Sequence, residues 1–557
     1  MKRFLLAAST ALLLTACDVG MDPAMDTLDM PEVADGTLSE DTMKRVTERL
    51  SSDEFEGRAP GTPGEEKTVA YLIEEFEKAG LEPGNNGSWV QEVPLVEITG
   101  KDYAPLTIGG AEGGPIDLEY ASDWVGVSYR EDVQTTLEDS ELVFVGYGIN
   151  APEKGWNDYE GLDMAGKTAV ILVNDPDFGA ETLEGPFNGK AMTYYGRWTY
   201  KYEEAARQGA AGVILIHQTA PASYGWNVVS GSWTGAQLDL ARAPGEGYFA
   251  AVESWVSEGR ARQMFDLAGL DFDALTAAAA QPGFTPVEMT GLTASGSLHN
   301  STRTMDSRNV VGVIPGTTHP DEYVIYTAHW DHIGIRDVAE GEDGIYNGAV
   351  DNATGTAAIL EIGEAFMANP PERSVMILAV TAEESGLLGS AYYGENPIVP
   401  FSQTVGGINI DAMLPTGRSR DIIVVGHGAS ELEDVLETVA SEQDRYIVPD
   451  PNPEAGYFYR SDHISLAKHG VPMLYADSGS VAEDGGRDYG AQIEAAYRLQ
   501  AYHKPADEFD PNWDMSGFVQ STELMYRVSR RLADSEDWPN WYEDNEFRAI
   551  RDAMMQD

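Results

Sequence analysis

The sequence has almost no cysteine: Cys17 is the single cysteine among 557 residues. A disulfide bond within the chain is therefore excluded, and so is a metal site built from several cysteines. Any metal ion must be held by histidine, aspartate and glutamate side chains, which suit zinc. The hydrophobic and charged fractions, 42% and 23%, are ordinary for a globular protein.

Basic residues are also scarce, because 36 lysines and arginines stand against 92 aspartates and glutamates, a formal charge of −56. Such a surface repels nucleic acid and anionic lipid, so a nucleic-acid partner is excluded. A solvated acidic surface and adaptation to a saline medium, where self-repulsion is screened, both explain this charge. The sequence does not separate the two explanations.

The N-terminal apolar run, residues 4–14, is too short to span a bilayer, which takes roughly 20 residues. It follows the basic pair Lys2-Arg3 and precedes small residues, as in a signal peptide. Leu14-Thr15-Ala16-Cys17 resembles the lipobox of bacterial lipoproteins, in which the cysteine receives the lipid. We therefore expect a lipoprotein signal peptide over 1–17. The resemblance implies an exported chain anchored to the cell envelope through Cys17, on the periplasmic side in a Gram-negative cell.

The length predicts two to four domains. Residues 18–37 are acidic, lack an apolar period and are predicted to form a tether. Changes in the pattern of apolar runs then divide the chain into a first part of the main domain, 38–122, an insert, 123–290, and a second part, 291–557. The insert contains apolar runs of strand length at 142–145, 168–173 and 212–216, and its segment 203–214 resembles the protease-associated domain, a non-catalytic module of exopeptidases.

Two helices are predicted at the start of the first part. Ser39 can cap one of them. Thr62-Pro63-Gly64-Glu65 has the pattern of a capping box, with proline at the first helical position of the other.

From about Asn309 onward, apolar strands alternate with helices. The predicted strands cover 323–327, 374–380, 405–410 and 471–475. Because each is almost continuously apolar, we expect strands buried on both faces of a largely parallel sheet.

Polar residues follow each of these strands. His329-Trp330-Asp331-His332 follows the first, Glu383-Glu384 the second and Asp411 the third. Asp351 stands at a helix start, and Tyr502-His503 lies near the C-terminus. Since ligands gather at the carboxyl ends of parallel strands, we expect these side chains to converge.

The residue types of this set suit a pair of zinc ions that share one bridging carboxylate. Five ligands are available, and Glu383 is left over to act as a base. The five are His329, Asp351, Glu384, Asp411 and His503.

The motifs resemble those of the co-catalytic zinc exopeptidases, which include bacterial aminopeptidases and relatives of glutamate carboxypeptidase. The motifs that carry the resemblance, in chain order, are 329–332, Val350-Asp351-Asn352-Ala353-Thr354-Gly355, 382–390, Asn409-Ile410-Asp411 and 502–507. The resemblance implies an α/β fold, in which helices flank a mostly parallel mixed sheet and a small protease-associated domain is inserted.

The resemblance also implies a role for each residue. His329 and Asp411 would hold one zinc ion, and Glu384 and His503 the other. Asp351 would bridge the two ions. Glu383 would be the general base that takes a proton from a metal-bridging water and later gives it to the leaving amine. Asp331 would orient His329, and Tyr502 would donate a hydrogen bond to the oxyanion.

The expected activity is removal of N-terminal residues from peptides. A carboxypeptidase of the same fold stays open; it needs arginines that bind a free carboxylate, and Arg460 is the obvious candidate. A glutaminyl cyclase-like enzyme with one zinc ion and a receptor without activity are disfavoured, because both ligand sets are complete. Ser461-Asp462-His463 is not a serine triad, since adjacent residues do not point at one another as a triad requires. The side-chain preference and the oligomeric state are left open.

Overall fold

The computed structural model describes residues 38–110, 114–243, 246–247 and 249–556. The predicted signal peptide with Cys17 and the predicted tether, 18–37, lie outside the described residues. The residues described all fall within one compact unit. Within them, a helix with the length and apolar character needed to cross a membrane is not found.

Two helices open the described part, as predicted. Helix α1 (Glu40–Leu50) begins after Ser39, whose side chain accepts a hydrogen bond from the Thr42 amide. Helix α2 (Pro63–Ala79) begins at the proline, but the predicted capping box is wrong. The Thr62 hydroxyl donates to the Ala59 carbonyl instead. The Glu65 carboxylate accepts from the Gly61 amide and pairs with Arg308, so neither side chain is free to cap the helix.

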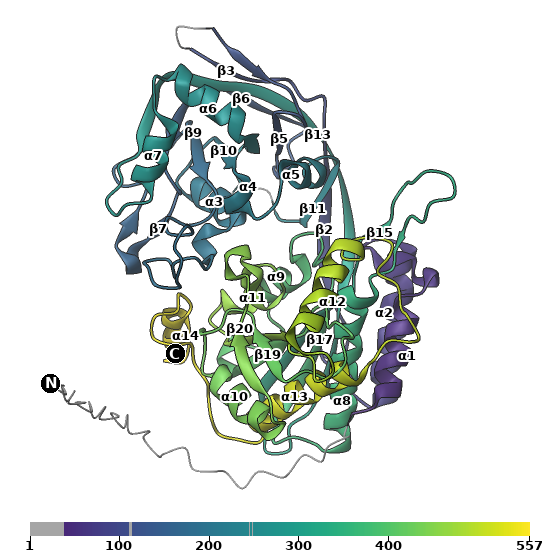
Figure 1. The fold of residues 1–557 in the computed structure, drawn as a ribbon. Helices are drawn as coiled ribbons and strands as arrows, with labels where there is room; N and C mark the ends of the chain where they lie inside the picture. Colours follow the sequence, from purple (N-terminus) through teal and green to yellow (C-terminus); the bar gives the residue numbers. More distant parts are fainter. Residues whose placement is uncertain (1–37, 111–113, 244–245, 248, 557) are drawn as a thin grey trace, which may run out of the picture. The chain divides into compact units, whose positions relative to one another are not determined.

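The four strands predicted for the second part form the centre of a mixed sheet (Figure 1). Neighbouring strands pair parallel in the order β17, β14, β18, β21. Antiparallel pairs with β13 and β19 extend the sheet on both sides, and β20 pairs parallel with β19. The strands are β13 (Val287–Ile314), β14 (His319–His329), β17 (Arg373–Val380), β18 (Thr404–Asn409), β19 (Asp421–Val424), β20 (Tyr446–Pro449) and β21 (Met473–Ser478).

Helices cover both faces of this sheet, which explains why its strands are apolar throughout. One face carries α1, α2, α8 (Gly355–Ala368) and α13 (Ser516–Ala533). The other carries α9 (Leu388–Glu395) and α11 (His463–Ala467). Successive residues of β14 point to opposite faces of the sheet. The Tyr326 hydroxyl donates to the Met525 carbonyl of α13, whereas Ile325 packs in the core beneath α9 and α11.

The insert has a parallel sheet of its own, in the order β6, β9, β10, β12. Its strands β6 (Gln134–Phe144), β9 (Thr168–Leu172) and β10 (Gly212–His217) match the predicted runs, and β12 covers Val252–Ser257. Helix α3 (Trp198–Arg207) precedes β10. The hydrophobic core here extends from Leu106 to Leu298, which is wider than the predicted range 123–290.

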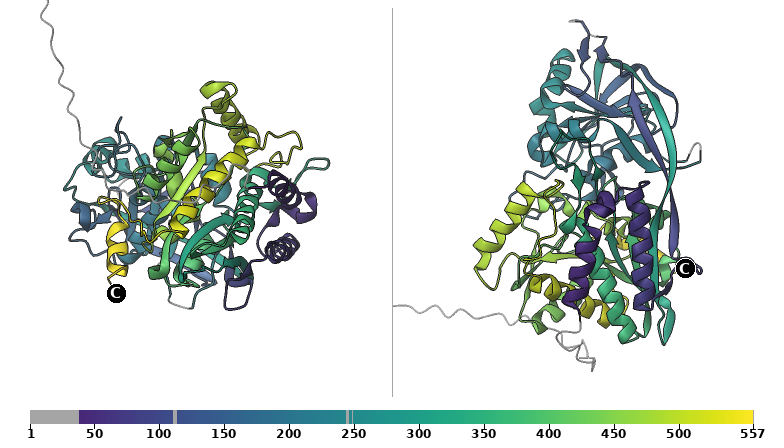
Figure 2. Two further views of the ribbon diagram at one scale, coloured as in Figure 1. Left: turned by 90° about the horizontal axis from the view of Figure 1, so that it is seen from below. Right: turned by 90° about the vertical axis from the view of Figure 1, so that its right-hand side faces the viewer.

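A long antiparallel ribbon connects the two sheets. Strand β2 (Val90–Lys101) pairs with β13 over residues 299–310. The N-terminal part of β13 pairs with β6 of the insert, and its C-terminal part pairs with β17 of the central sheet. The ribbon therefore runs along both parts of the unit, as the side view in Figure 2 shows.

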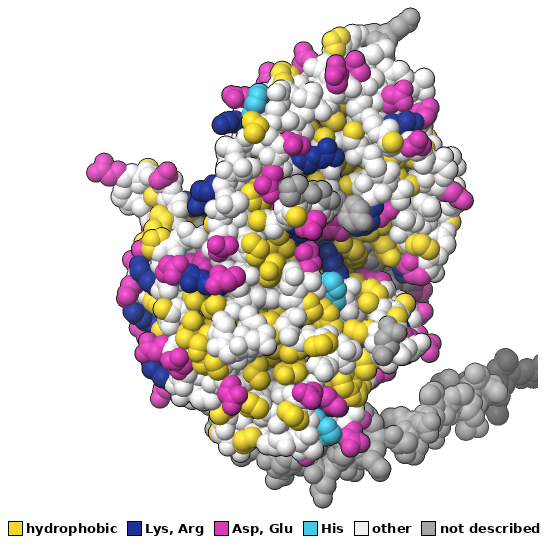
Figure 3. Space-filling view, turned by 180° about the vertical axis from the view of Figure 1, so that it is seen from behind, with side chains coloured by type: hydrophobic (Ala, Val, Ile, Leu, Met, Phe, Trp, Pro, Cys, Tyr) yellow, Lys and Arg dark blue, Asp and Glu magenta, His cyan; other side chains and the backbone are white. Residues whose placement is uncertain are grey.

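Acidic side chains are spread over the face drawn in Figure 3. They occur along the edges of both parts and do not form a single patch. A dispersed acidic surface of this kind fits both explanations that the composition allows.

Candidate metal centre

The polar residues predicted to converge lie together beyond the carboxyl ends of the parallel strands. His329 is the last residue of β14, the two glutamates Glu383 and Glu384 follow β17, and Asp411 follows β18. Asp351 lies in the turn before α8, where the Asp351–Asn352 peptide bond is cis. His503 follows α12 (Gly486–Gln500). The sheet topology thus assembles residues that are far apart in the sequence.

Asp351 stands between two groups of side chains. Its Oδ1 lies 3.2 Å from His329 Nε2, and that nitrogen is 3.3 Å from Asp411 Oδ1. Its Oδ2 lies 3.1 Å from His503 Nε2, and that nitrogen is 3.2 Å from Glu384 Oε2. One carboxylate therefore turns one oxygen to each group, as a bridging ligand does.

His332 joins the second group, although the sequence analysis gave it no role. Its Nδ1 lies 2.5 Å from Glu384 Oε1, and the side chain is 0% exposed. The sequence signal that could have identified His332 is its position three residues after His329, in the loop that follows β14.

Further residues hold these side chains in place. The Asp331 carboxylate accepts hydrogen bonds from the Glu383 and Glu384 amides. His329 Nδ1 is 3.1 Å from the main-chain carbonyl of Asp331 and 3.7 Å from its carboxylate. Asp331 therefore positions the two glutamates as well as the histidine.

Two more positioning residues were missed by the sequence analysis. Asp507 accepts hydrogen bonds from the Val350 and Asp351 amides, at 3.0 and 3.1 Å. The Ser461 hydroxyl donates to Asp411 Oδ2 at 2.6 Å. Both residues stand inside segments that the sequence singled out, at 502–507 and 460–463, but their contacts depend on how the loops fold.

The pKa values reflect the density of charge in this cluster. Burial and the neighbouring carboxylates raise the pKa of Glu383 well above its usual value, although His329 opposes them. Burial acts against protonation of His503, but Glu384 and Asp351 raise its pKa to about 9. Hydrogen bonds to His329 and His503 overcome burial and hold the pKa of Asp351 well below its usual value.

The cluster fits divalent cations. Carboxylates buried next to one another are unfavourable without a compensating cation. Nε2 of His332 is buried without a hydrogen-bond partner. His329, Glu383 and Asp411 offer ligand atoms within 4.8 Å of one another, and so do His332, Asp351 and Glu384. Imidazole and carboxylate are the ligands that zinc uses in such sites.

Two tyrosines face the cluster. The Tyr502 ring stacks on the His503 ring, with the centroids 3.9 Å apart. Burial and nearby carboxylates, Asp351 first, raise the pKa of Tyr502 well above its usual value, so its hydroxyl keeps its proton. Tyr475, which the sequence analysis did not consider, has its pKa raised in the same way by burial and by Asp411.

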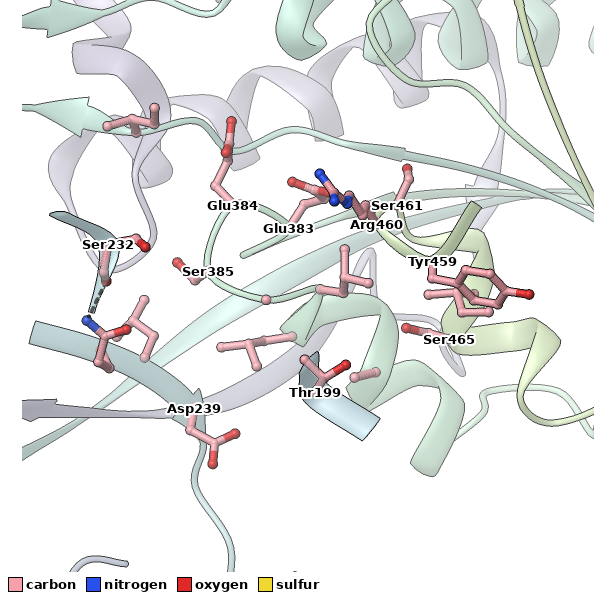
Figure 4. A pocket seen from close by; sticks show the side chains of 18 of the residues that line it. Thr199, Ser232, Asp239, Glu383, Glu384, Ser385, Tyr459, Arg460, Ser461 and Ser465 are labelled. Atoms are coloured by element: carbon pink, nitrogen blue, oxygen red, sulfur yellow. Dashed lines mark hydrogen bonds between the residues drawn. The ribbon is translucent and has the colours of Figure 1, made fainter. Parts of the chain in front are cut away.

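A cavity of about 1760 Å³ opens onto the cluster. Its wall includes residues of the insert, such as Thr199 and Asp239, as well as Glu383, Arg460 and Ser461 of the second part (Figure 4). The cavity is large enough for a peptide segment.

The segment 460–463 does not form a serine triad, as the sequence analysis expected. Ser461 donates to Asp411, and Asp462 accepts from the Ser390 hydroxyl. His463 packs against Phe458 and Tyr475, at 4.6 and 5.0 Å between ring centroids, and belongs to neither ligand group.

Part of the chain is similar in sequence to known peptidases. Residues 309–527 match the sequence profile of peptidase family M28. Aminopeptidase NAALADL1 of Mus musculus is 34% identical over 139 residues, which are 23% of this chain and 17% of that protein. Aminopeptidase YwaD of Bacillus subtilis (strain 168) is 34% identical over 89 residues, 16% of this chain and 17% of that protein. The chain thus spans less than a fifth of each of these curated relatives.

Among solved structures, the aminopeptidase from Aneurinibacillus sp. strain AM-1 superposes with a TM-score of 0.48 at 17% sequence identity. The superposition covers 90% of this chain and 96% of that one.

Proposed function

Because residues 309–527 match the sequence profile of peptidase family M28, we propose that the chain is a zinc-dependent exopeptidase that removes N-terminal residues from peptides. The observation that carries this proposal is the position of Asp351 between the His329–Asp411 pair and the His503–Glu384 pair. In the proposed arrangement, each pair would hold one zinc ion together with Asp351. His332 contacts the other carboxylate oxygen of Glu384, Oε1, through its Nδ1.

Two zinc ions at this site would polarise the scissile carbonyl and lower the pKa of a water molecule. Glu383 acts as the general base. Its Oε2 lies 4.0 Å from His329 Nε2, beside the first group, while Glu384 contacts the second group. Glu383 accepts the proton of the attacking water, holds it on its carboxylate and delivers it to the leaving nitrogen.

The two tyrosines provide hydrogen-bond donors. Because the Tyr502 hydroxyl keeps its proton, it can donate to the oxyanion that develops on the scissile carbonyl. Tyr475 is a second donor of the same kind. A positioned donor of this kind typically contributes about 100- to 1000-fold to turnover.

The acidic surroundings favour a free amino terminus over a free carboxyl terminus. Glu383 and the other carboxylates attract an α-ammonium group and repel a terminal carboxylate. A long peptide with neutral side chains tests this polarity. We expect the zinc-loaded protein to cleave it and a chelator to stop cleavage. Acetylation of the amino terminus should abolish cleavage, whereas amidation of the carboxyl terminus should be tolerated; the reverse pattern contradicts the proposal.

Carboxypeptidase activity is the second candidate. It is favoured by one observation, the meeting of Arg460 with a second arginine, Arg197, in the cavity wall. A single-zinc cyclase has no such support, because the described residues provide two ligand groups.

We also propose that the chain is exported and anchored to the cell envelope by a lipid on Cys17, and that the insert is a protease-associated domain. The support for the anchor is the lipobox-like segment 14–17. Replacing Cys17→Ser should move the protein from the membrane fraction to the soluble fraction of its native host and leave peptide hydrolysis intact. A wild-type protein that is soluble and carries no lipid rules the anchor out.

A further inference from the structure

Strand β11 (Ala236–Leu240) of the insert is the outer strand of the long ribbon. It pairs antiparallel with β2, on the edge of β2 opposite to β13, in a register that runs from Ala236 opposite Thr99 to Leu240 opposite Leu95. Within the described part of the chain, β11 has no second strand beside it. Its other edge is therefore open, and an open edge presents main-chain N–H and C=O groups that can pair with a further strand.

The hydrogen bonds of β11 show which of its main-chain groups face the open edge. One residue beyond the strand, the Ala241 amide donates to the Pro94 carbonyl of β2 at 2.9 Å. Hydrogen-bonded residues alternate with non-bonded ones along an antiparallel pair, so every second residue before Ala241 also faces β2. The residues between them turn their N–H and C=O groups to the open edge, and these residues are Leu240, Leu238 and Ala236.

Leu238 offers an amide and a carbonyl that are both free. At Leu240, by contrast, the amide donates to Asp239 Oδ1 at 2.8 Å and the carbonyl accepts from Arg242 at 3.3 Å, so both outward groups are engaged. Among the described residues, none makes such a bond with the outward groups of Leu238. Leu238 is half-buried and lines the cavity, so these two groups are available to a ligand bound there.

The open edge lies along the cavity that contains the metal centre. All five residues of β11 line this cavity. Successive side chains of a strand point to opposite faces, so a cavity beneath one face would meet every second side chain. Contact with five residues in succession indicates that the cavity follows the edge. Figure 4 shows Asp239 of β11 in the same pocket as Glu383 and Glu384.

Hydrophobic packing holds β11 against the segment that carries the two glutamates. Leu240 shares a core cluster with Ala382 and Leu388, and Leu238 packs against that cluster. Ala382 directly precedes Glu383, and Leu388 is the first residue of α9. A peptide whose scissile bond lies at the metal centre therefore has the edge of β11 beside its path through the cavity.

We propose that the open edge of β11 binds the main chain of the peptide substrate as an added strand, with Leu238 as the pairing residue. The Leu238 amide donates to a carbonyl of the peptide, and its carbonyl accepts from a peptide amide. This inference rests on the proposed peptidase function and narrows its substrate class to extended peptides that continue for several residues beyond the scissile bond. Main-chain pairing gives affinity that depends little on the side chains of the peptide.

Peptides with a single methylated amide test the pairing. The parent peptide is Leu-Ala-Ala-Ala-Ala-Ala-amide, and four derivatives carry N-methylalanine at position 3, 4, 5 or 6, which leaves the first peptide bond unchanged. Calorimetry with the zinc-loaded Glu383→Gln variant measures binding while hydrolysis is slowed. Methylation should weaken binding by roughly 3- to 10-fold at one position, or at two positions separated by one residue, and should have little effect at the positions between.

The variant Leu238→Pro, in the same Glu383→Gln background, tests the protein side of the pairing. Proline removes the outward amide but no bond to β2, and proline is tolerated on an edge strand. Leu238→Ala is the matched control, because it also shortens the side chain but keeps the amide. We expect the proline variant to bind the parent peptide roughly 3- to 10-fold more weakly than the alanine variant. Leu-Ala-amide, which is too short to reach along the edge, should bind equally to both variants.

Two results overturn the added strand. One is an equal effect of methylation at all four positions, or no effect at any of them. The other is equal binding of the parent peptide by the proline and alanine variants when both have the circular dichroism spectrum of the unsubstituted protein. If Leu238→Pro does not fold, the methylated peptides decide alone, because they leave the chain unchanged at β11. If the zinc-loaded wild type hydrolyses no peptide but the alternating pattern is found, the proposed function fails and the binding edge stands.

Discussion

Glu383 and Glu384 follow the same strand but meet different partners. Glu384 is 3.2 Å from His503 and 2.5 Å from His332, whereas Glu383 is 4.0 Å from His329. At the scale of the residue, this difference supports the proposed roles, in which Glu384 is a metal ligand and Glu383 is the base.

The variant Glu383→Gln tests that separation. Glutamine keeps nearly the same shape but accepts no proton, so we expect the zinc content to stay normal. General acid–base catalysis is worth about 10²- to 10⁴-fold, and Glu383 acts twice in the proposed mechanism, so kcat should fall by at least about 10³-fold. KM should change little, because the lost interaction belongs to the transition state.

Glu384→Gln is the matched comparison, one position along the chain. It should lower the zinc content as well as kcat, because it removes a ligand. Zinc content and steady-state kinetics, measured for both variants, distinguish the ligand from the base. Loss of zinc in Glu383→Gln alone would show that Glu383 is the ligand and Glu384 the base. A near-normal kcat in Glu383→Gln would rule out Glu383 as the general base.

The gathering of the candidate ligands could be predicted from the sequence, because each of them except His503 follows an apolar strand or begins a helix. The contacts of His332, Asp507 and Ser461 could not be predicted. Each depends on a loop conformation that brings a side chain to a partner between 50 and 157 residues away. A pattern in the sequence contains no information on such pairs.

At the scale of the element, the buried parallel strands were predictable because all of their residues are apolar. The continuous 28-residue strand β13 was not predictable. Its middle, residues 301–304, is exposed and polar, and the strand is held by pairing with β2, β6 and β17, which lie far away in the sequence. The failed capping box has a similar cause, since Arg308 of β13 pairs with Glu65 and local propensity is overridden by a distant residue.

Glu253 provides a prediction for the insert. It lies on β12, 4% exposed, and burial raises its pKa from 4.5 to about 8. The folded state therefore binds the proton more tightly than the unfolded state. The resulting stabilisation is complete below pH 4.5 and is lost as the pH rises through about 8.

The variant Glu253→Gln keeps the shape of the side chain and an acceptor for the Ala250 amide but carries no charge. Between about pH 5 and pH 9, the free energy of unfolding of the wild type should therefore fall relative to that of the variant. At about 1.4 kcal/mol per pKa unit, the difference is at most about 5 kcal/mol. Urea unfolding at several pH values measures it, and Glu138→Gln, an exposed glutamate of β6, is the control. Parallel pH profiles for wild type and Glu253→Gln would contradict the prediction.

At the scale of the whole molecule, the insert and the central sheet meet at the cavity. The wall of the cavity combines Arg197, Asp239 and Tyr224 of the insert with the metal centre of the second part. Changes along the sequence predicted an insert but gave no information on this meeting, because no motif records which surfaces of two segments face each other. The arginine pair shows this directly: Arg460 was a candidate from the sequence, and Arg197 became one only in the folded chain.

The metal centre links chemistry to the stability of the whole unit. Its candidate ligands come from the ends of β14, β17 and β18, the turn before α8, and the segment after α12, so bound metal would join separate elements. Without cations, the buried carboxylates around Asp351 and Glu383 repel one another. Metal that binds only to the folded state therefore stabilises that state.

We expect purified, zinc-replete protein to contain close to two zinc ions per chain. Chelation should abolish hydrolysis and lower the melting temperature, and added zinc should restore both. Asp411→Asn should bind about one ion and show a smaller shift on chelation, because the first group loses a charged ligand while His503 and Glu384 remain. A stoichiometry of one in the fully active wild type contradicts the two-ion site and returns the single-zinc cyclase to consideration.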